Sequence, residues 1–244
     1  MYKEDILTLR EILKASKNLC VFTGAGISVP SGIPDFRSAD GLYNQESGLN
    51  IPPEQIISHS FFVRHPKEFY DFYKSKMLYP QALPNAAHRY FAALERKGKR
   101  VSVVTQNIDG LHQKAGSSRV YEIHGSVLRN FCMQCGAKYG VDVVSESEGI
   151  PYCKKCGGMI KPDVVLYEEP LDEQVVTGAV HAIEAADTLL VIGTSLVVYP
   201  AASYIRFYGG DNLVIINKSK TDYDRFAKLA IYEDIVRVVE DLQK

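Results

Sequence analysis

The sequence lacks an excess of charge of either sign. Its 28 lysines and arginines nearly balance its 29 aspartates and glutamates, which gives a formal net charge of −1 at pH 7 over 244 residues. Proteins built mainly to bind nucleic acid usually carry a strong basic excess, so we expect no direct nucleic-acid partner. With 46% hydrophobic and 23% charged residues, the chain is typical of proteins that have a packed core.

Long hydrophobic runs are also missing. The most apolar stretch, residues 188–202, is interrupted by glycine, threonine, serine and proline, so it is too short and too broken to cross a bilayer. The first five residues carry charges of both signs, unlike a secretory leader. We therefore expect a cytoplasmic protein with no membrane partner. The sequence leaves the oligomeric state open, and a monomer is the favoured expectation.

Cysteine is scarce, and four of the five cysteines lie in one segment. Cys132-x-x-Cys135 and Cys153-x-x-Cys156 are matched pairs separated by seventeen residues, a spacing that lets four thiolates surround one tetrahedral ion. Disulfides are disfavoured in a reducing compartment, so the pairs predict one structural Zn²⁺ per chain. Because four thiolates close the coordination shell, this zinc should not be catalytic.

Short apolar runs without polar alternation recur along the chain, as in strands buried on both faces of a parallel sheet. Helical patterns lie at residues 3–15, 85–96 and 171–186. Together they predict an α/β fold with a Rossmann-like, doubly wound parallel sheet. The expected strands are residues 19–22, 101–104, 120–123, 164–166, 189–192 and 213–216.

Two segments break this alternation and are expected to be insertions. Residues 38–84 combine aromatics and prolines with short helical patterns, which predicts a helical module over one edge of the sheet. Residues 129–160 hold the four cysteines and little apolar content, which predicts a zinc-ribbon module. The remaining segments, 1–37, 85–128 and 161–244, would form the Rossmann-like domain.

A glycine turn, Gly24-Ala25-Gly26, follows the first expected strand. Glycines there let the backbone approach a pyrophosphate, although Val29 replaces the third glycine of the dinucleotide fingerprint, and the motif alone is weak. Small and polar residues also follow two other expected strands, where a nucleotide would lie in a parallel sheet. They are Gly193, Thr194, Ser195, Asn217 and Lys218.

Two long strings are the most specific features. Residues 24–37 read Gly-Ala-Gly-Ile-Ser-x-x-Ser-Gly-Ile-Pro-Asp-Phe-Arg, and residues 105–112 read Thr-Gln-Asn-Ile-Asp-Gly-Leu-His. Both resemble signature segments of the sirtuin family. His124-Gly125, the cysteine pairs, residues 193–196 and Asn217 then follow in the sirtuin order. The resemblance covers nearly the whole chain and implies a Rossmann-type domain, a small zinc module, and a cleft in which NAD meets an acyl-lysine protein or peptide.

The resemblance implies an NAD-dependent protein-lysine deacylase, chiefly a deacetylase, that yields deacylated lysine, nicotinamide and O-acyl-ADP-ribose. Histidine titrates near neutrality and suits the general base, and His124 is the candidate. Gln106 and Asn107 would hold ribose hydroxyls and order a water. Asp109, with the backbone of Ile108, would bind the nicotinamide carboxamide. The other histidines are expected to be structural: His59, His65, His88, His112 and His181.

Further NAD contacts are implied by the same resemblance. Phe36 would cover the reacting ribose, and Arg37 would contact phosphate directly or through its loop. The remaining expected contacts are Gly24, Ala25, Gly26 and Asp35 on one side, and Gly193, Thr194, Ser195, Asn217, Lys218 and Asp234 toward the adenosine half.

The peptide is expected to add as a strand between two segments, a mode in which main-chain bonds give affinity. The expected contacts are Val164, Val165, Leu166 and Tyr167 in one segment and Val197 and Val198 in the other. The first segment fits a buried core strand equally well. Sirtuins that prefer succinyl or malonyl lysine carry Tyr-x-x-Arg, whereas Tyr70 is followed here by Tyr73. The resemblance implies that both tyrosines contact the acyl-lysine substrate. An acidic acyl group would be buried unpaired, so neutral acyl groups are favoured.

A glutamate, Glu168, stands where the family commonly has glycine in Phe-Gly-Glu. Either the backbone there avoids positive φ, or the groove is reshaped. We hypothesise that Glu168 adds a preference for basic sequence around the lysine.

Three other functions fit parts of the sequence. A protein mono-ADP-ribosyltransferase shares nicotinamide expulsion, but His124 and the neutral acyl pocket favour deacylation. A zinc-ribbon nucleic-acid binder is disfavoured by the balanced charge. An ordinary NAD dehydrogenase is disfavoured by the incomplete fingerprint and the closed metal site.

Overall fold

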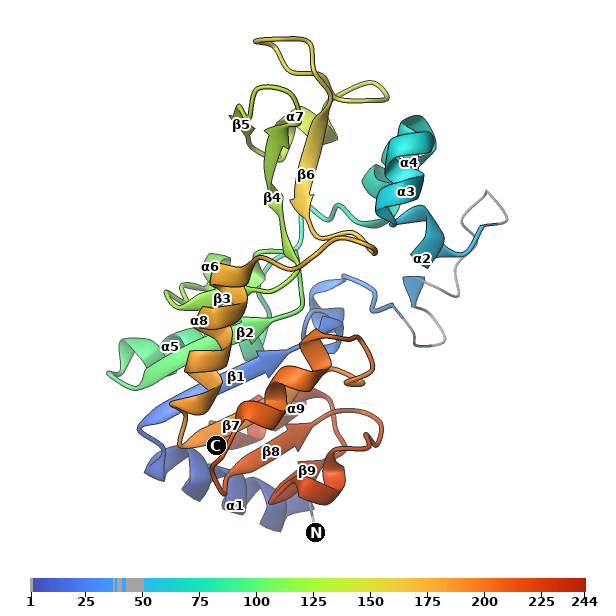
Figure 1. Cartoon of the computed structure of the whole chain (residues 1–244). Helices are drawn as coiled ribbons and strands as arrows, with labels where there is room; N and C mark the ends of the chain where they lie inside the picture. Colours follow the sequence, from blue (N-terminus) through green and yellow to red (C-terminus); the bar gives the residue numbers. More distant parts are fainter. Residues whose placement is uncertain (1, 37, 39–40, 43–50) are drawn as a thin grey trace.

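A computed structural model describes residues 2–36, 38, 41–42 and 51–244 (Figure 1). Arg37, an expected phosphate contact, lies outside these residues. The described chain forms a large parallel sheet with helices on both faces, and a smaller module of strands and helices stands at one end of it (Figure 1).

The large sheet has the order β3-β2-β1-β7-β8-β9, and all of its neighbouring strands are parallel. This is the doubly wound order, in which the winding reverses between β1 and β7 and the carboxyl ends of these two strands open a crevice. The six strands are β1 (Asn18–Thr23), β2 (Arg100–Thr105), β3 (Val120–Glu122), β7 (Thr188–Ile192), β8 (Leu213–Ile216) and β9 (Leu229–Ile231). The predicted fold class is therefore confirmed.

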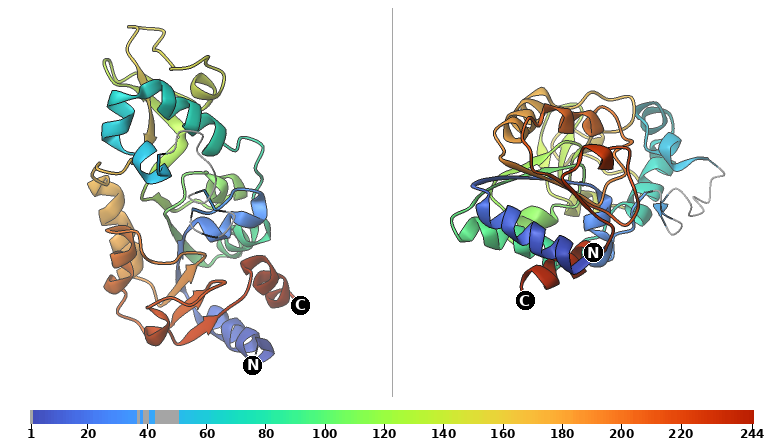
Figure 2. Two further views of the ribbon diagram at one scale, coloured as in Figure 1. Left: turned by 90° about the vertical axis from the view of Figure 1, so that its right-hand side faces the viewer. Right: turned by 90° about the horizontal axis from the view of Figure 1, so that it is seen from below.

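Helices cover both faces of this sheet, as Figure 2 shows from below. In β1, Leu19 and Val21 belong to one apolar cluster and Cys20 and Phe22 to the other, as the alternation of side chains in a strand requires. The first cluster includes α1 (Tyr2–Ala15), α5 (Ala86–Arg96) and α9 (Ile235–Leu242), and the second includes α8 (Glu173–Glu184) and the 3-10 helix η4 (Ala201–Phe207). No helix in the described ranges combines the length and apolar character needed to cross a membrane.

The smaller module combines an antiparallel sheet with the helical insertion. The sheet has the order β5-β4-β6, and the helices lie beside it (Figure 1). One apolar cluster joins Phe62 and Phe69 of the helices to Val127 and Val164 of the sheet. Its elements are α2 (Pro53–Ile56), α3 (His59–Arg64), α4 (Pro66–Lys76), β4 (Gly125–Cys132), β5 (Lys138–Tyr139), α7 (Asp142–Ser145) and β6 (Ile160–Val164). The helical segment thus covers the small sheet, and not an edge of the large one as the sequence suggested.

Two strand predictions need correction. Residues 164–166 were expected in the parallel sheet, but only Val164 is in a strand, and that strand is β6 of the antiparallel sheet. An apolar run indicates that a segment is buried, but it does not indicate which sheet the segment belongs to. Here Val164 and Leu166 are buried against the helical module. Strand β9 was not among the predicted strands. The small sheet extends beyond 129–160 at both ends, and the division into domains stays a prediction.

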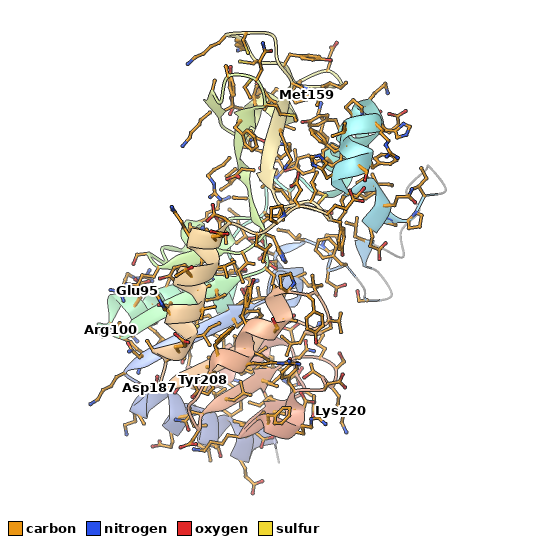
Figure 3. The ribbon with its side chains drawn as sticks, viewed as in Figure 1. Glu95, Arg100, Met159, Asp187, Tyr208 and Lys220 are labelled. Carbon is orange, nitrogen blue, oxygen red and sulfur yellow. The ribbon has the colours of Figure 1, made fainter. Side chains whose placement is uncertain are left out.

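The amino ends of the central strands are held by Asp187, which precedes β7 (Figure 3). Its carboxylate accepts hydrogen bonds from Ser16 Oγ at 2.6 Å and from the backbone N–H groups of Lys17 at 2.8 Å and Asn18 at 2.9 Å. Partial burial raises the pKa of Asp187, but these hydrogen bonds outweigh it and hold the pKa below its ordinary value. One side chain therefore fixes β1 against β7.

Replacing Asp187 by asparagine should lower the free energy of unfolding by about 1 kcal/mol, or about 2–4 °C in Tm. A depressed pKa contributes stability above the unfolded-state value and loses it as pH falls through the folded-state value. The difference between wild type and Asp187→Asn should therefore shrink in acid. Thermal unfolding at several pH values measures this, with Asp211→Asn on a nearby loop as the control. An equal loss in both variants would contradict the assignment.

Candidate active site

Two glycine turns meet at the crevice between β1 and β7. The N–H of Gly26 donates to the carbonyl of Gly193 at 2.8 Å. A Cβ added to Gly26 would lie 2.7 Å from Gly193 Cα, and one added to Gly24 would lie 2.7 Å from Thr194 Cβ. Gly193 also has φ +60, which disfavours other residues. The contact between the two turns therefore already demands glycine, before any ligand is considered.

A cavity of about 1120 Å³ opens at this crevice and extends to the small module. Its size suits a large ligand, since sites for single small molecules are about 300–1,000 Å³. Every expected NAD contact in the described residues lines it. These are Gly24, Ala25, Gly26, Asp35, Phe36, Gln106, Asn107, Ile108, Asp109, His124, Gly193, Thr194, Ser195, Asn217, Lys218 and Asp234.

Asp109 is held in a network that includes a residue the sequence did not single out. Ser28 Oγ donates to Asp109 Oδ2 at 2.7 Å and accepts from Asn107 Nδ2 at 3.0 Å, while the N–H of Leu111 donates to Asp109 Oδ1 at 2.8 Å. Burial raises the pKa of Asp109, and the hydrogen bonds from Ser28, Leu111 and Asn107 oppose it without cancelling it. The position of Ser28 inside the 24–37 string was the available signal.

His124 lies in the turn between β3 and β4, and its Nδ1 is 3.0 Å from the carbonyl oxygen of Gln106. A carbonyl can only accept, so Nδ1 carries the proton and Nε2 keeps its lone pair. Burial lowers the pKa of His124, and the bond to Gln106 opposes this. The ring is therefore neutral at pH 7, as a general base requires. Gln106 Nε2 also donates to Thr194 Oγ1 at 3.1 Å, which ties this motif to the turn after β7.

An ion pair is part of the cavity lining after β8 and β9. Asp234 caps α9 by accepting from the N–H of Val236 at 2.9 Å, and its other oxygen lies 3.0 Å from Lys218 Nζ. Asn217 donates from Nδ2 to the carbonyl of Ser219 at 2.9 Å. Three of the polar residues expected near the adenosine half, Asn217, Lys218 and Asp234, thus lie just after β8 and β9.

The expected peptide groove borders the same cavity. The N–H of Val165 donates to the carbonyl of His124 at 3.0 Å, and that of Tyr167 donates to the carbonyl of Ile57 at 3.1 Å. This segment is therefore held between the candidate base and the helical module. Five expected contacts line the cavity, namely Val164, Val165, Leu166, Tyr167 and Val198, whereas Val197 is 53% exposed outside its lining.

Tyr70 and Tyr73, the expected acyl contacts, lie elsewhere. Both are fully buried, and neither is among the residues that line the cavity. Tyr70 donates to the carbonyl of Ile160, and Tyr73 stacks on Phe69 with ring centroids 5.6 Å apart. The aromatic residues of α4 build the core shared with the small sheet.

Glu168 adopts φ +75, so the suggestion that the backbone avoids positive φ here is wrong. Its carboxylate accepts from the N–H of Ser60 at 2.9 Å and from the Ser60 hydroxyl, near the start of α3. The neighbouring Glu169 accepts from Lys161 Nζ at 3.0 Å and from the N–H of Leu166 at 2.9 Å. No sequence pattern predicted this partly buried Lys161–Glu169 pair, which fixes the groove segment to β6.

The four paired cysteines converge as predicted. Their sulfur atoms all lie within 4.8 Å of one another, with Cys132 to Cys156 at 3.4 Å and Cys135 to Cys153 at 3.6 Å. Zinc with bonds of about 2.3 Å to sulfur places tetrahedral sulfurs roughly 3.8 Å apart. The donor set and its spacing therefore fit one zinc ion with no open position.

A profile described as the Sir2 family matches residues 24–200. The chain belongs to the Sir2 family. The NAD-dependent protein deacetylase of Clostridium perfringens (strain 13 / Type A) is 56% identical over 237 residues, which is 97% of each chain. A solved Sir2 structure with a p53 peptide and NAD⁺ is 40% identical, with TM-score 0.84 over 97% of this chain and 96% of that one. Another, with 2′-O-acetyl-ADP-ribose and a deacetylated p53 peptide, is 38% identical with the same TM-score over 97% of each chain.

The zinc site of this sirtuin should be structural. Purified protein is expected to hold one zinc per chain, and Cys135→Ala should lose it, because three thiolates leave the ion open to water and chelators. The small sheet should then unfold, since metal binding supplies its folding free energy.

Zinc content by elemental analysis and protease cleavage within residues 125–164 measure these effects. Cys20→Ala, in the large sheet, is the control and should keep its zinc. A Cys135→Ala protein with full zinc would contradict the assignment.

Proposed function

We propose that this protein removes acyl groups, chiefly acetyl, from lysine side chains of other proteins, and that it consumes NAD and releases nicotinamide and O-acyl-ADP-ribose. One observation carries the proposal: a single cavity is bordered by the glycine turn, by His124 and by the groove segment from Val164 to Tyr167. Acyl transfer to a nucleotide sugar requires this arrangement, because base, sugar and acyl group must be held within reach of one another.

In the proposed reaction the acyl oxygen attacks the ribose carbon, whose bond to nicotinamide breaks so that nicotinamide leaves. A ribose hydroxyl then attacks the acyl carbon, the bond from that carbon to the lysine nitrogen breaks to release the amine, and addition of water gives O-acyl-ADP-ribose. His124 takes the proton of that hydroxyl at Nε2, because its Nδ1–H is held by the carbonyl of Gln106. The same bond keeps the ring from rotating, so the lone pair stays in one direction. The lowered pKa of His124 keeps it able to accept a proton at neutral pH.

Asp109 is proposed to accept a hydrogen bond from the nicotinamide carboxamide. Each of its oxygens already receives one bond, from Ser28 and from Leu111, and each retains a further lone pair. These bonds fix the carboxylate before the ligand arrives. Asn107, which donates to Ser28 at 3.0 Å, is proposed to hold the neighbouring ribose.

The acyl group is proposed to be neutral. Phe36 and Ile108 pack against the apolar cluster of the small module and also line the cavity, so the surroundings of the acyl chain are apolar on this side. A carboxylate placed there would be desolvated without a partner. The cytoplasmic location and the monomeric state remain expectations from the sequence.

Replacing His124 by alanine should reduce turnover by about 10²–10⁴-fold, the range typical of a lost general base. The purified protein is incubated with an acetyl-lysine peptide with and without NAD, and peptide mass and free nicotinamide are followed. Because burial lowers the pKa of His124, kcat should fall in acid only below the ordinary histidine value of about 6.5.

His181→Ala, on the exposed side of α8, is the matched control and should keep wild-type turnover. Nicotinamide release by the wild type without loss of acetyl, together with a gain in mass on the acceptor, would identify ADP-ribosyl transfer instead. No turnover by the zinc-loaded protein on any acyl peptide would refute the proposed function.

We also propose that Glu168 gives the groove a preference for basic sequence around the lysine. Its exposed carboxylate lies beside Tyr167, and hydrogen bonds from Ser60 hold its pKa below the ordinary value, so it stays charged at neutral pH. A fixed negative charge at the groove favours positively charged peptide residues.

Glu168→Gly should reduce the ratio of kcat/KM between peptides with arginine and with aspartate beside the acetyl-lysine by about twofold to fivefold, which is the range of an exposed charge pair. Glycine tolerates the positive φ, so the backbone should be kept. Glu168→Gln removes only the charge and should show the same loss of preference. If the ratio stays unchanged in both variants, Glu168 does not select the peptide.

A further inference from the structure

Two buried histidines that the proposed reaction does not use pack against each other. His88 lies in the first turn of α5 and His112 in α6 (Leu111–Ala115), and both are almost completely buried. Their ring centroids are 4.8 Å apart and their planes are inclined by 64°. Within the described residues, His88 Nε2 and His112 Nδ1 have no hydrogen-bond partner. Buried polar atoms are nearly always paired, so the two nitrogens require an explanation.

The position of the proton on His88 follows from its partner. His88 Nδ1 lies 3.3 Å from the backbone N–H of Asn85, in the capping box of α5. A backbone N–H can only donate, so Nδ1 must carry a lone pair. Burial lowers the pKa of His88 to about 4, and the ring is therefore neutral at pH 7. Its single proton is on Nε2, which is the unpaired atom and hence an unpaired donor.

The position of the proton on His112 follows from two threonines. Thr23 Oγ1 donates to Thr105 Oγ1 at 2.8 Å, which uses the only proton of that hydroxyl. His112 Nε2, 3.2 Å from Thr23 Oγ1, must therefore donate to it. Burial first, and the adjacent His88 second, keep the pKa of His112 well below its ordinary value. Its Nδ1 then has a lone pair and is an unpaired acceptor.

The two rings, whose centroids are 4.8 Å apart, thus leave one donor and one acceptor without a partner. We propose that His88 Nε2–H donates to His112 Nδ1, and that this neutral pair is a positioning element for the reaction. The pair orients His112 so that its Nε2–H donates to Thr23 Oγ1. It fixes a directed chain of hydrogen bonds that begins at the cap of α5 and ends at the cavity.

The end of the chain lies among the residues proposed to bind NAD, and this step rests on the proposed function. Thr105 Oγ1 accepts from the N–H of Asn107 at 3.0 Å, and Asn107 Nδ2 reaches Ser28, which holds Asp109. At the other end, Asn85 Nδ2 donates to the carbonyl of Ile27 at 2.8 Å, beside the glycine turn. The pair therefore joins the glycine turn and the 105–112 segment through the core, behind the cavity they line.

Nitrogen-15 spectroscopy of the imidazoles tests the pair directly. In protein labelled at histidine, both rings should be neutral with the proton on Nε2 at pH 7, and a coupling across a hydrogen bond should join His88 Nε2 to His112 Nδ1. His124 serves as the internal control, since its carbonyl partner predicts a proton on Nδ1. A proton on Nδ1 of His88 or His112, or no coupling between the rings, would overturn the proposal.

A double-mutant cycle tests the same bond without labels. His88→Phe and His112→Phe each leave a polar atom of the other ring buried without a partner, whereas the double variant leaves neither. The loss of unfolding free energy in the double variant should therefore be smaller than the sum of the single losses. Losses that add would show that the rings do not interact.

Variants of Thr23 test the positioning role. Thr23→Val keeps the shape but removes the hydroxyl together with its hydrogen bonds to Thr105 and His112. It should raise KM for NAD by about fivefold to tenfold, with KM for the acetyl peptide unchanged. Thr23→Ser should restore the wild-type value. Equal changes in both KM values, or no change in Thr23→Val, would refute the role. If the wild type proves not to deacylate, the spectra and the cycle still decide the pair, and calorimetric NAD binding replaces KM.

Discussion

The close approach of two backbone turns, at the ends of β1 and β7, is the constraint on which the candidate site depends. Gly26 and Gly193 come so near that a Cβ on either would overlap the other turn. This contact sets the crevice at which the doubly wound sheet changes its winding direction. It also brings Thr194 within hydrogen-bonding distance of Gln106. The segment that presents Asn107 and Asp109 is thereby fixed to both halves of the sheet.

A second apolar core places the other wall of the cavity. The helical insertion buries its aromatic residues against Val127 and Val164 of the small sheet. The groove segment follows β6 and is tied back by the Lys161–Glu169 ion pair. Zinc and this shared core therefore act on the same short strands. Distortion of either would move the segment that is proposed to hold the peptide.

The sequence was most informative where chemistry restricts the choice of residue. The cysteine spacing predicted the sulfur cluster, the apolar runs predicted five of the six strands of the large sheet, and the motifs identified the family and the lining of the cavity. It was least informative about packing between insertions. Val164, Leu166 and the aromatic residues of α4 pack in one apolar cluster, although they are far apart in the chain. Tyr70 and Ile160, which form a hydrogen bond there, are separated by 90 residues. Local periodicity cannot predict such a contact.

The sequence also cannot predict which ring nitrogen of each buried histidine carries the proton. Burial lowers the pKa of His88, His112 and His124 alike, so all three are neutral at pH 7 and composition cannot tell them apart. Their hydrogen-bond partners can. His124 has a carbonyl at Nδ1 and therefore keeps a lone pair on Nε2. His88 has a backbone N–H at Nδ1 and therefore carries its proton on Nε2. The same side chain is therefore a candidate base beside the cavity in one place and a proposed donor in the core in another, because the backbone group at Nδ1 decides which nitrogen keeps the proton.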